Sequence, residues 1–103
     1  MPVYTKELQQ ILNEDFSEEF VSKMKNRVLL SRFKYGAVKD NYASGKIDCI
    51  KTLEERLKKY KETGNTEWLI DVANQAMIEF KYPQHEKGHF RVTSAEESPG
   101  LRR

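Results

Sequence analysis

The amino-acid sequence predicts an all-α protein: a compact helical bundle of about four helices with an extended C-terminal arm. Apolar residues recur at spacings of three and four over most of the first 82 positions, as they do on one face of an α-helix. Glycine and helix-capping residues separate these periodic stretches, and the periodicity ends at Tyr82 and Pro83. We therefore divide the chain into a helical domain, residues 1–82, and a C-terminal arm, residues 83–103.

The first two helices are expected at residues 4–13 and 17–35. Ser17 is a suitable N-cap for the second helix, because its hydroxyl can accept a hydrogen bond from an exposed backbone N–H group. That helix should end before Gly36. Its apolar residues change sides along its length, which indicates either contact with two neighbours or a kink.

The third and fourth helices are expected at residues 46–63 and 66–81, joined by a tight turn that favours an antiparallel hairpin. Gly64 supplies a left-handed position after the first of them, and Asn65 or Thr66 can cap the next. Six apolar residues share the main face of the last helix: Leu69, Val72, Ala73, Ala76, Met77 and Phe80. Further apolar residues on its other sides indicate a central position in the bundle or a subunit contact.

Charge is distributed unevenly along the chain. Residues 1–19 carry one lysine against five acids, a net charge of −4, whereas residues 20–46 carry seven cationic residues against one acid, a net charge of +6. The basic segment ends in the stretch RFKYGAVKDNYASGK, which also contains three aromatic residues and two glycines. Cationic side chains can neutralise phosphate and aromatic rings can stack on a base, so this composition is typical of nucleotide and single-strand binding.

We predict that these residues bind a phosphate-bearing small molecule, a nucleotide or a nucleotide-derived signal. The arm adds hydrogen-bond donors suited to an anion, especially if two arms meet in an oligomer. The candidate ligand-binding residues are Arg32, Lys34, Tyr35, Lys39, Tyr42, Lys46, His89, Arg91, Thr93, Ser94 and Ser98. In the alternative interpretation the stretch is the solvated end of a helix, where long cationic side chains cover apolar surface. The chain lacks the glycine and lysine spacing of a P-loop.

No catalytic residue can be assigned from the residue types. His85 and His89 are four apart, but Pro83 and Gly88 oppose the helix that a histidine metal site at this spacing requires. The single cysteine, Cys49, has no disulfide partner and is expected to be a small buried thiol. Neither a membrane span nor a signal peptide is expected, so we predict a cytoplasmic protein.

The acidic residues of the last two helices follow a pattern that bears on catalysis. Glu54 and Glu55 precede the tight turn, and Glu67 and Asp71 follow it. Over residues 52–80 this arrangement resembles the MazG-like all-α nucleoside triphosphate pyrophosphohydrolases, whose helices carry E-E-x-x-E and E-x-x-D motifs for the metal. Here a lysine takes the third acidic position, and the second pair has a spacing of four. The resemblance implies magnesium as a cofactor, whereas ordinary ion pairs with neighbouring lysines are the other explanation of these acids.

A second resemblance covers about two-thirds of the chain. The segments RFKYGAVKDNYASGK, TGNTEWLIDVANQAMIEFKYPQ and TSAEESPG resemble small bacteriophage proteins. The resemblance implies a phage origin and hence the host cytoplasm as the location. Phages encode small oligomeric proteins that sequester the nucleotide signals of bacterial immune systems, and this class supplies the analogy for counter-defence.

The expected function is therefore capture of a phosphate-bearing small molecule, without catalysis and without a cofactor, by a homo-oligomer. Helices that are apolar on several sides favour the oligomer. The main alternative is a magnesium-dependent pyrophosphohydrolase of the MazG-like type. A nucleic-acid binder is a further alternative and predicts a steep loss of affinity with salt. An inhibitor of a host protein also remains open.

Overall fold

The structure is a computed structural model of the 103-residue chain, and it describes residues 3–100. The described chain contains five α-helices and one short 3₁₀ turn, and no strand. The elements are α1 (Lys6–Asp15), α2 (Glu18–Tyr35), α3 (Val38–Ala43), α4 (Cys49–Thr63), α5 (Glu67–Lys81) and η1 (Ala95–Glu97). The predicted all-α fold is confirmed.

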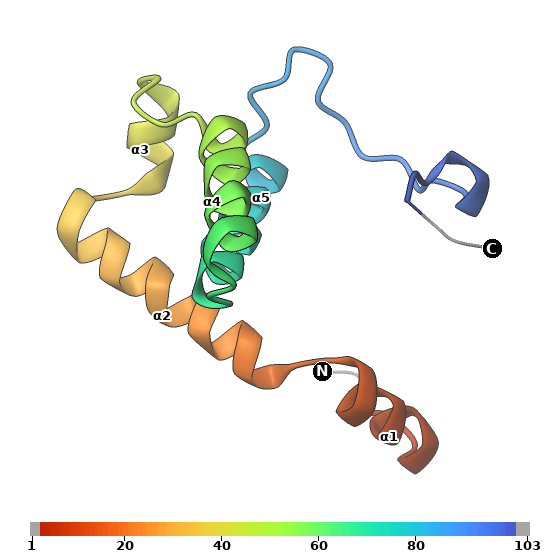
Figure 1. The fold of residues 1–103 in the computed structure, drawn as a ribbon. Helices are drawn as coiled ribbons and strands as arrows, with labels where there is room; N and C mark the ends of the chain where they lie inside the picture. The colour runs from red at the N-terminus through yellow and green to blue at the C-terminus, as the bar shows by residue number, and fades with distance from the viewer. Residues whose placement is uncertain (1–2, 101–103) are drawn as a thin grey trace.

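Helices α4 and α5 form the antiparallel hairpin that the sequence predicted, and α2 packs against α5 (Figure 1). Because α5 contacts both α2 and α4, it is the central helix. The buried residues of the described chain are few: Tyr42, Cys49, Ile70 and Asn74. Cys49 is buried, as expected.

The first helix begins two residues later than predicted. Thr5 is its N-cap, and the Thr5 hydroxyl accepts a hydrogen bond from the Leu8 backbone N–H at 3.2 Å. The helix therefore starts at Lys6 and continues to Asp15. Ser17 caps α2 as predicted, because its hydroxyl accepts a hydrogen bond from the Phe20 N–H at 3.0 Å.

Helix α4 begins three residues later than the predicted start at residue 46. The Asp48 carboxylate accepts a hydrogen bond from the Lys51 N–H at 3.0 Å and caps the helix, so the chain before it is not helical. Gly64 has the predicted left-handed conformation, with φ 72°. In the turn, Asn65 Oδ1 accepts a hydrogen bond from the Glu67 N–H at 3.0 Å, which starts α5 at Glu67.

The buried side of α5 differs from the apolar face that the sequence indicated. Ile70 and Asn74 are buried, whereas Phe80 of the predicted face is 73% exposed. The difference arises because α2 and α4 cover two sides of α5. The most buried residues of α5 therefore lie between the sides that these two helices contact. Helix α3 was not predicted at all, because six residues are too few to establish an apolar period.

The ends of the described chain extend away from the packed helices. Figure 1 shows α1 beyond one end of α2, and residues 83–100 running out from the α4–α5 hairpin on the side away from α3. This part of the arm is extended as predicted, and residues 101–103 lie outside the described residues. The Cα radius of gyration is 16.3 Å, compared with about 13 Å for a compact domain of this length. Across residues 3–100, no helix is both long and apolar enough to cross a membrane.

Candidate functional site

The end of α2, helix α3 and the segment that follows it carry the predicted cationic residues. Gly36, with φ 83°, turns the chain between the two helices. Asn41 Nδ2 donates a hydrogen bond to the Tyr35 carbonyl oxygen at 2.8 Å, which fixes α3 to the end of α2. Local backbone geometry therefore positions the corner.

We define the basic corner as Arg32, Lys34, Tyr35, Lys39 and Lys46. All five residues are exposed, and the Tyr35 side chain is 72% exposed. Within residues 3–100, none of its four cations forms an ion pair with a carboxylate. This stretch of the chain therefore carries both cations without carboxylate partners and an accessible aromatic ring, residue types that suit a phosphate and a base.

Tyr42 does not belong to this exposed surface, contrary to the sequence-based prediction. It is buried, and its hydroxyl donates a hydrogen bond to the Glu79 carboxylate of α5. Gln84 completes the contact: its backbone N–H donates to Glu79 at 2.9 Å, and its side-chain amide donates to the Tyr42 carbonyl oxygen at 3.0 Å. Tyr42 thus anchors α3 to α5 and to the start of the arm.

The environment of this anchor shifts three pKa values. Burial raises the pKa of the Tyr42 phenol, and the hydrogen bond with Glu79 raises it further. Burial also raises the pKa of the neighbouring Cys49 thiol. The hydrogen bond from Tyr42 lowers the pKa of the Glu79 carboxyl. These shifts favour a neutral phenol, a neutral thiol and an ionised carboxylate, as expected of a structural contact.

The candidate residues of the arm are not brought to the basic corner within one chain. Figure 1 shows the arm and α3 on different sides of the α4–α5 hairpin. Arg91 pairs with Glu97, with 2.6 Å between Nη2 and Oε2, and the Arg91 hydrogen bond lowers the pKa of Glu97. Ser94 caps η1, and its carbonyl oxygen accepts a hydrogen bond from the Ser98 hydroxyl at 3.2 Å.

The remaining two arm candidates are exposed. His89 Nδ1 lies 2.8 Å from the Lys87 carbonyl oxygen, and Thr93 makes no side-chain hydrogen bond among the described residues. The arm therefore satisfies most of its polar groups internally. It lies away from the basic corner of its own chain (Figure 1).

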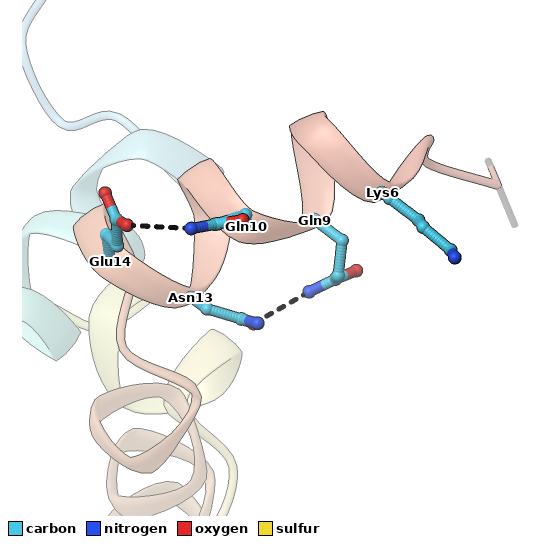
Figure 2. A pocket seen from close by; sticks show the side chains of 5 residues that line it. All are labelled: Lys6, Gln9, Gln10, Asn13 and Glu14. Carbon is cyan, nitrogen blue, oxygen red and sulfur yellow. Dashed lines mark hydrogen bonds between the residues drawn. The ribbon is translucent and has the colours of Figure 1, made fainter.

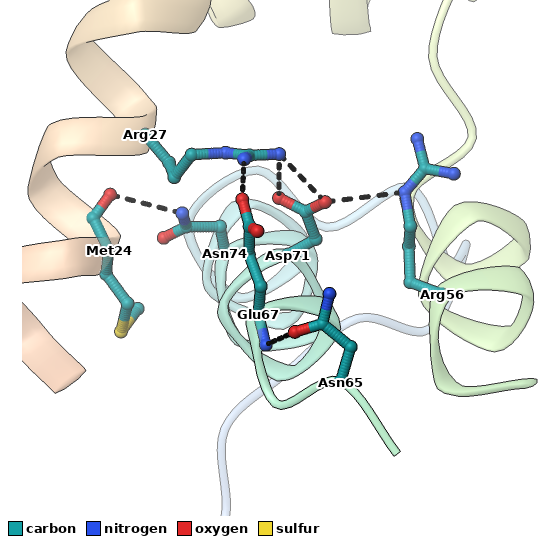
Figure 3. Close-up of polar contacts among 7 residues, drawn as sticks. All are labelled: Met24, Arg27, Arg56, Asn65, Glu67, Asp71 and Asn74. Carbon is teal, nitrogen blue, oxygen red and sulfur yellow. Dashed lines mark hydrogen bonds and ion pairs between the residues drawn. The ribbon is translucent and has the colours of Figure 1, made fainter. Parts of the chain in front are cut away.

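The acidic residues of the magnesium alternative do not form a metal site. Arg27 donates to Glu67 at 2.8 Å and to both oxygens of Asp71 at 2.9 and 3.0 Å (Figure 3). Glu54 and Glu55 are exposed on α4. No group of three His, Cys, Asp or Glu side chains suited to a metal was found in residues 3–100. Glu67 and Asp71 are thus paired with arginine and Glu54 and Glu55 lie apart from them on α4, so the four carboxylates do not fit magnesium.

The sequence analysis did not anticipate this arginine network. Arg56 Nε lies 3.6 Å from Asp71, so arginines of α2 and α4 both face one carboxylate of α5. Asn74 Nδ2 donates to the Met24 carbonyl oxygen at 3.1 Å on the same side (Figure 3). Because Arg27 is 44 residues from Asp71, no local pattern could have paired them.

Residues 3–100 contain hollows outside the basic corner, among them two that bear on the site. One, of about 620 Å³, lies between the first half of α2 and the α4–α5 turn, beside Arg27 and Glu67. Its cations Lys23 and Arg27 already pair with carboxylates. The other, of about 500 Å³, is a shallow hollow on the polar side of α1 alone (Figure 2). Neither hollow combines a cation without a carboxylate partner and an exposed aromatic ring, as the basic corner does.

Comparison of the chain with family models, curated proteins and solved structures found no match. The function must therefore be argued from the geometry of the chain itself.

Proposed function

We propose that this protein captures a phosphate-bearing small molecule, a nucleotide or a nucleotide-derived signal, at the basic corner and does not convert it. The observation that carries the proposal is the exposure of four cations without carboxylate partners in the same stretch of chain as the accessible Tyr35 ring. Arginine and lysine provide charge-assisted hydrogen bonds to phosphate oxygens, and the ring provides a stacking surface for a base.

The cations of the basic corner have no carboxylate partner, whereas Glu67 and Asp71 are paired with arginine. This difference supports binding of a ligand without its hydrolysis. Hydrolysis of a pyrophosphate bond by a MazG-like enzyme depends on carboxylates that are free to hold magnesium. In this chain Asp71 is only 16% exposed at its side chain and is held by Arg27. Within one copy, the cations of the basic corner form no ion pair with a carboxylate of residues 3–100 that would compete with a phosphate ligand.

The proposed setting is the cytoplasm of a bacterial host, where a phage protein of this kind acts in counter-defence by removing a nucleotide signal. Sequestration of a signal requires affinity and abundance but no reaction. A homo-oligomer fits this function, because the arm of one copy can supply His89, Thr93 and Ser94 to the corner of another. The exposed apolar residues of α1 and α2 support association between copies.

The experiment is a binding titration by calorimetry with a panel of mononucleotides and cyclic nucleotides, followed by analysis of the recovered ligand. We expect one member to bind and to be recovered unchanged. The double variant Tyr35→Ala with Lys39→Glu should weaken that binding at least tenfold, because it removes the ring and reverses one charge. Lys58→Glu, the same charge reversal on the exposed side of α4, is the matched control.

Three outcomes contradict the proposal. Recovery of a cleaved ligand shows turnover. Equal affinity for the double variant and the Lys58→Glu control places the site elsewhere. Binding that depends steeply on salt but not on nucleotide identity indicates a nucleic-acid surface instead.

A further inference from the structure

Helix α2 carries an apolar face that the rest of the described chain leaves exposed. Leu29 and Leu30 are each 57% exposed, and Phe33 is 86% exposed. With 3.6 residues per turn, these three lie opposite Phe20 and Met24, which are half-buried on the side of α2 that meets α5. We call Leu29, Leu30 and Phe33 the α2 outer face.

Cationic residues border the α2 outer face on both edges. Helical spacing places Lys25 and Arg32 along one edge, and Lys23 and Lys34 along the other. Within residues 3–100, Lys25, Arg32 and Lys34 form no ion pair, and Lys23 pairs only with its neighbour on the helix. A partner for this face should therefore be apolar along its centre and acidic at its edge.

Helix α1 has these properties. Leu8, Ile11 and Leu12 lie on one face, and Leu8 and Ile11 are about half exposed. Glu7 and Glu14 follow one edge of this face, and Asp15 lies on the face itself at the end of the helix, within a segment whose net charge is −4. The chain therefore contains both an apolar face bordered by cations and an apolar face bordered by carboxylates.

The other side of α1 is suited to water. Figure 2 shows Gln9 and Asn13 joined side chain to side chain, at 3.0 Å, and Gln10 joined to Glu14 at 3.4 Å. These polar groups are satisfied within the helix and can remain at the surface when the apolar side is covered. Helix α1 is thus amphipathic, and only one of its sides needs a partner.

The α1 helix of the same chain cannot cover the α2 outer face. Only Phe16 and Ser17 separate the two helices, and α1 is ten residues, about 15 Å, long. If α1 folded back along α2, it would reach only to about residue 27, short of Leu29. The part of α2 within its reach presents Ser22 and Asn26 on this side, which do not match an apolar helix.

We infer that two copies of this chain dock reciprocally, with α1 of each copy on the α2 outer face of the other. The arrangement is two-fold symmetric, so both apolar faces of both copies are covered and the assembly closes as a dimer. The surface available is sufficient. A compact protein of this mass exposes about 6,000 Å², whereas this chain exposes 9124 Å². The exposed α1 and α2 faces contribute to this excess, and a permanent dimer buries about 2,000 Å² or more.

The first test measures molar mass by light scattering after size-exclusion chromatography, without any nucleotide, so that it is independent of the proposed ligand. We expect a dimer for the natural chain and a monomer for Ile11→Glu and for Leu29→Glu. Gln10→Glu, which makes the same charge change on the polar side of α1, should remain a dimer. A monomeric natural chain, or a dimer that survives both substitutions, overturns the inference.

A second test does not depend on the folding of charged variants. A chain with Ile11→Cys is mixed with a chain with Leu30→Cys and oxidised, while the native Cys49 stays protected by its burial. Reciprocal docking predicts a disulfide between the two chains and much less with Gln10→Cys in place of Ile11→Cys. Equal cross-linking of both cysteine positions on α1 contradicts the inference.

Discussion

Tyr42 and Glu79 show how one polar contact can connect three parts of the chain. The Tyr42 hydroxyl donates to Glu79, and Gln84 binds both residues, so α3, α5 and the start of the arm meet at one point. The hydrogen bond lowers the pKa of the Glu79 carboxyl in the folded state. A carboxyl whose pKa is lower in the folded than in the unfolded state stabilises the fold at neutral pH, and this stabilisation is lost as the pH falls through the folded-state pKa.

We therefore expect Tyr42→Phe to reduce the free energy of unfolding at neutral pH by about 1–2 kcal/mol, the usual contribution of a hydrogen bond to a charged group. The variant should also lose less stability between neutral pH and pH 3, because its Glu79 pKa returns towards the ordinary value of about 4.3. Urea unfolding followed by circular dichroism at several pH values measures both effects.

Tyr60→Phe is the matched control, because Tyr60 is a half-buried tyrosine of α4 whose hydroxyl makes no hydrogen bond among the described residues. If Tyr42→Phe and the natural chain lose the same stability on acidification, Glu79 does not contribute in this way. The basic corner lies beside this anchor, so the same variant should also loosen α3.

The α4–α5 hairpin depends on the conformation of its turn. Gly64 has φ 72°, and a side chain at this position would meet no atom within 4 Å. Any cost of substitution therefore comes from the backbone conformation and not from crowding. A left-handed conformation costs a non-glycine residue about 1–2 kcal/mol.

Gly64→Ala should accordingly lower the free energy of unfolding by about 1 kcal/mol, while Gly64→Asn should lower it less, because asparagine tolerates the left-handed region. Thermal unfolding of the three proteins checks this order. If alanine is as stable as glycine, the turn must adopt another conformation, and the hairpin geometry would have to be revised.

The helices show which structural features can be predicted from local sequence. Ser17 correctly predicted the start of α2, and Gly64 correctly predicted the end of α4. Both predictions succeed because capping and left-handed positions depend on a few adjacent residues. The start of α4 differs from the prediction because the apolar period includes Ile47, whereas the Asp48 cap excludes that residue from the helix. The buried side of α5 was misplaced because it depends on where α2 lies, and that position depends on the distant contact between Arg27 and Asp71.

The candidate site likewise contains one part that the local sequence predicts and one part that it does not. The exposed cations of the basic corner follow from their place at the end of a helix, and the sequence identified them. Tyr42 has the same residue type as Tyr35 and lies only seven positions away, yet one ring is buried and the other is 72% exposed. Only the position of Glu79 on α5 distinguishes them, and no pattern within residues 32–46 contains that information.

For the molecule as a whole, the buried core is small in relation to the exposed apolar surface. Three hydrophobic residues of the described chain are buried, whereas 15 large ones are exposed. A chain of about 100 residues gains its stability mainly from apolar burial. In a single copy, the small buried core therefore offsets little of the conformational entropy that is lost on folding. Association then contributes to folding stability, and that contribution depends on protein concentration.

The melting temperature should therefore rise with protein concentration. Mass action predicts the rise, because unfolding of a dimer releases two chains and is suppressed when chains are abundant. Circular dichroism melts over a wide range of concentrations measure it, with Gln10→Glu expected to behave like the natural chain. Leu29→Glu should melt at a lower temperature that does not change with concentration. A concentration-independent melt of the natural chain would mean that one copy is stable by itself, and the α2 outer face would then need a different partner.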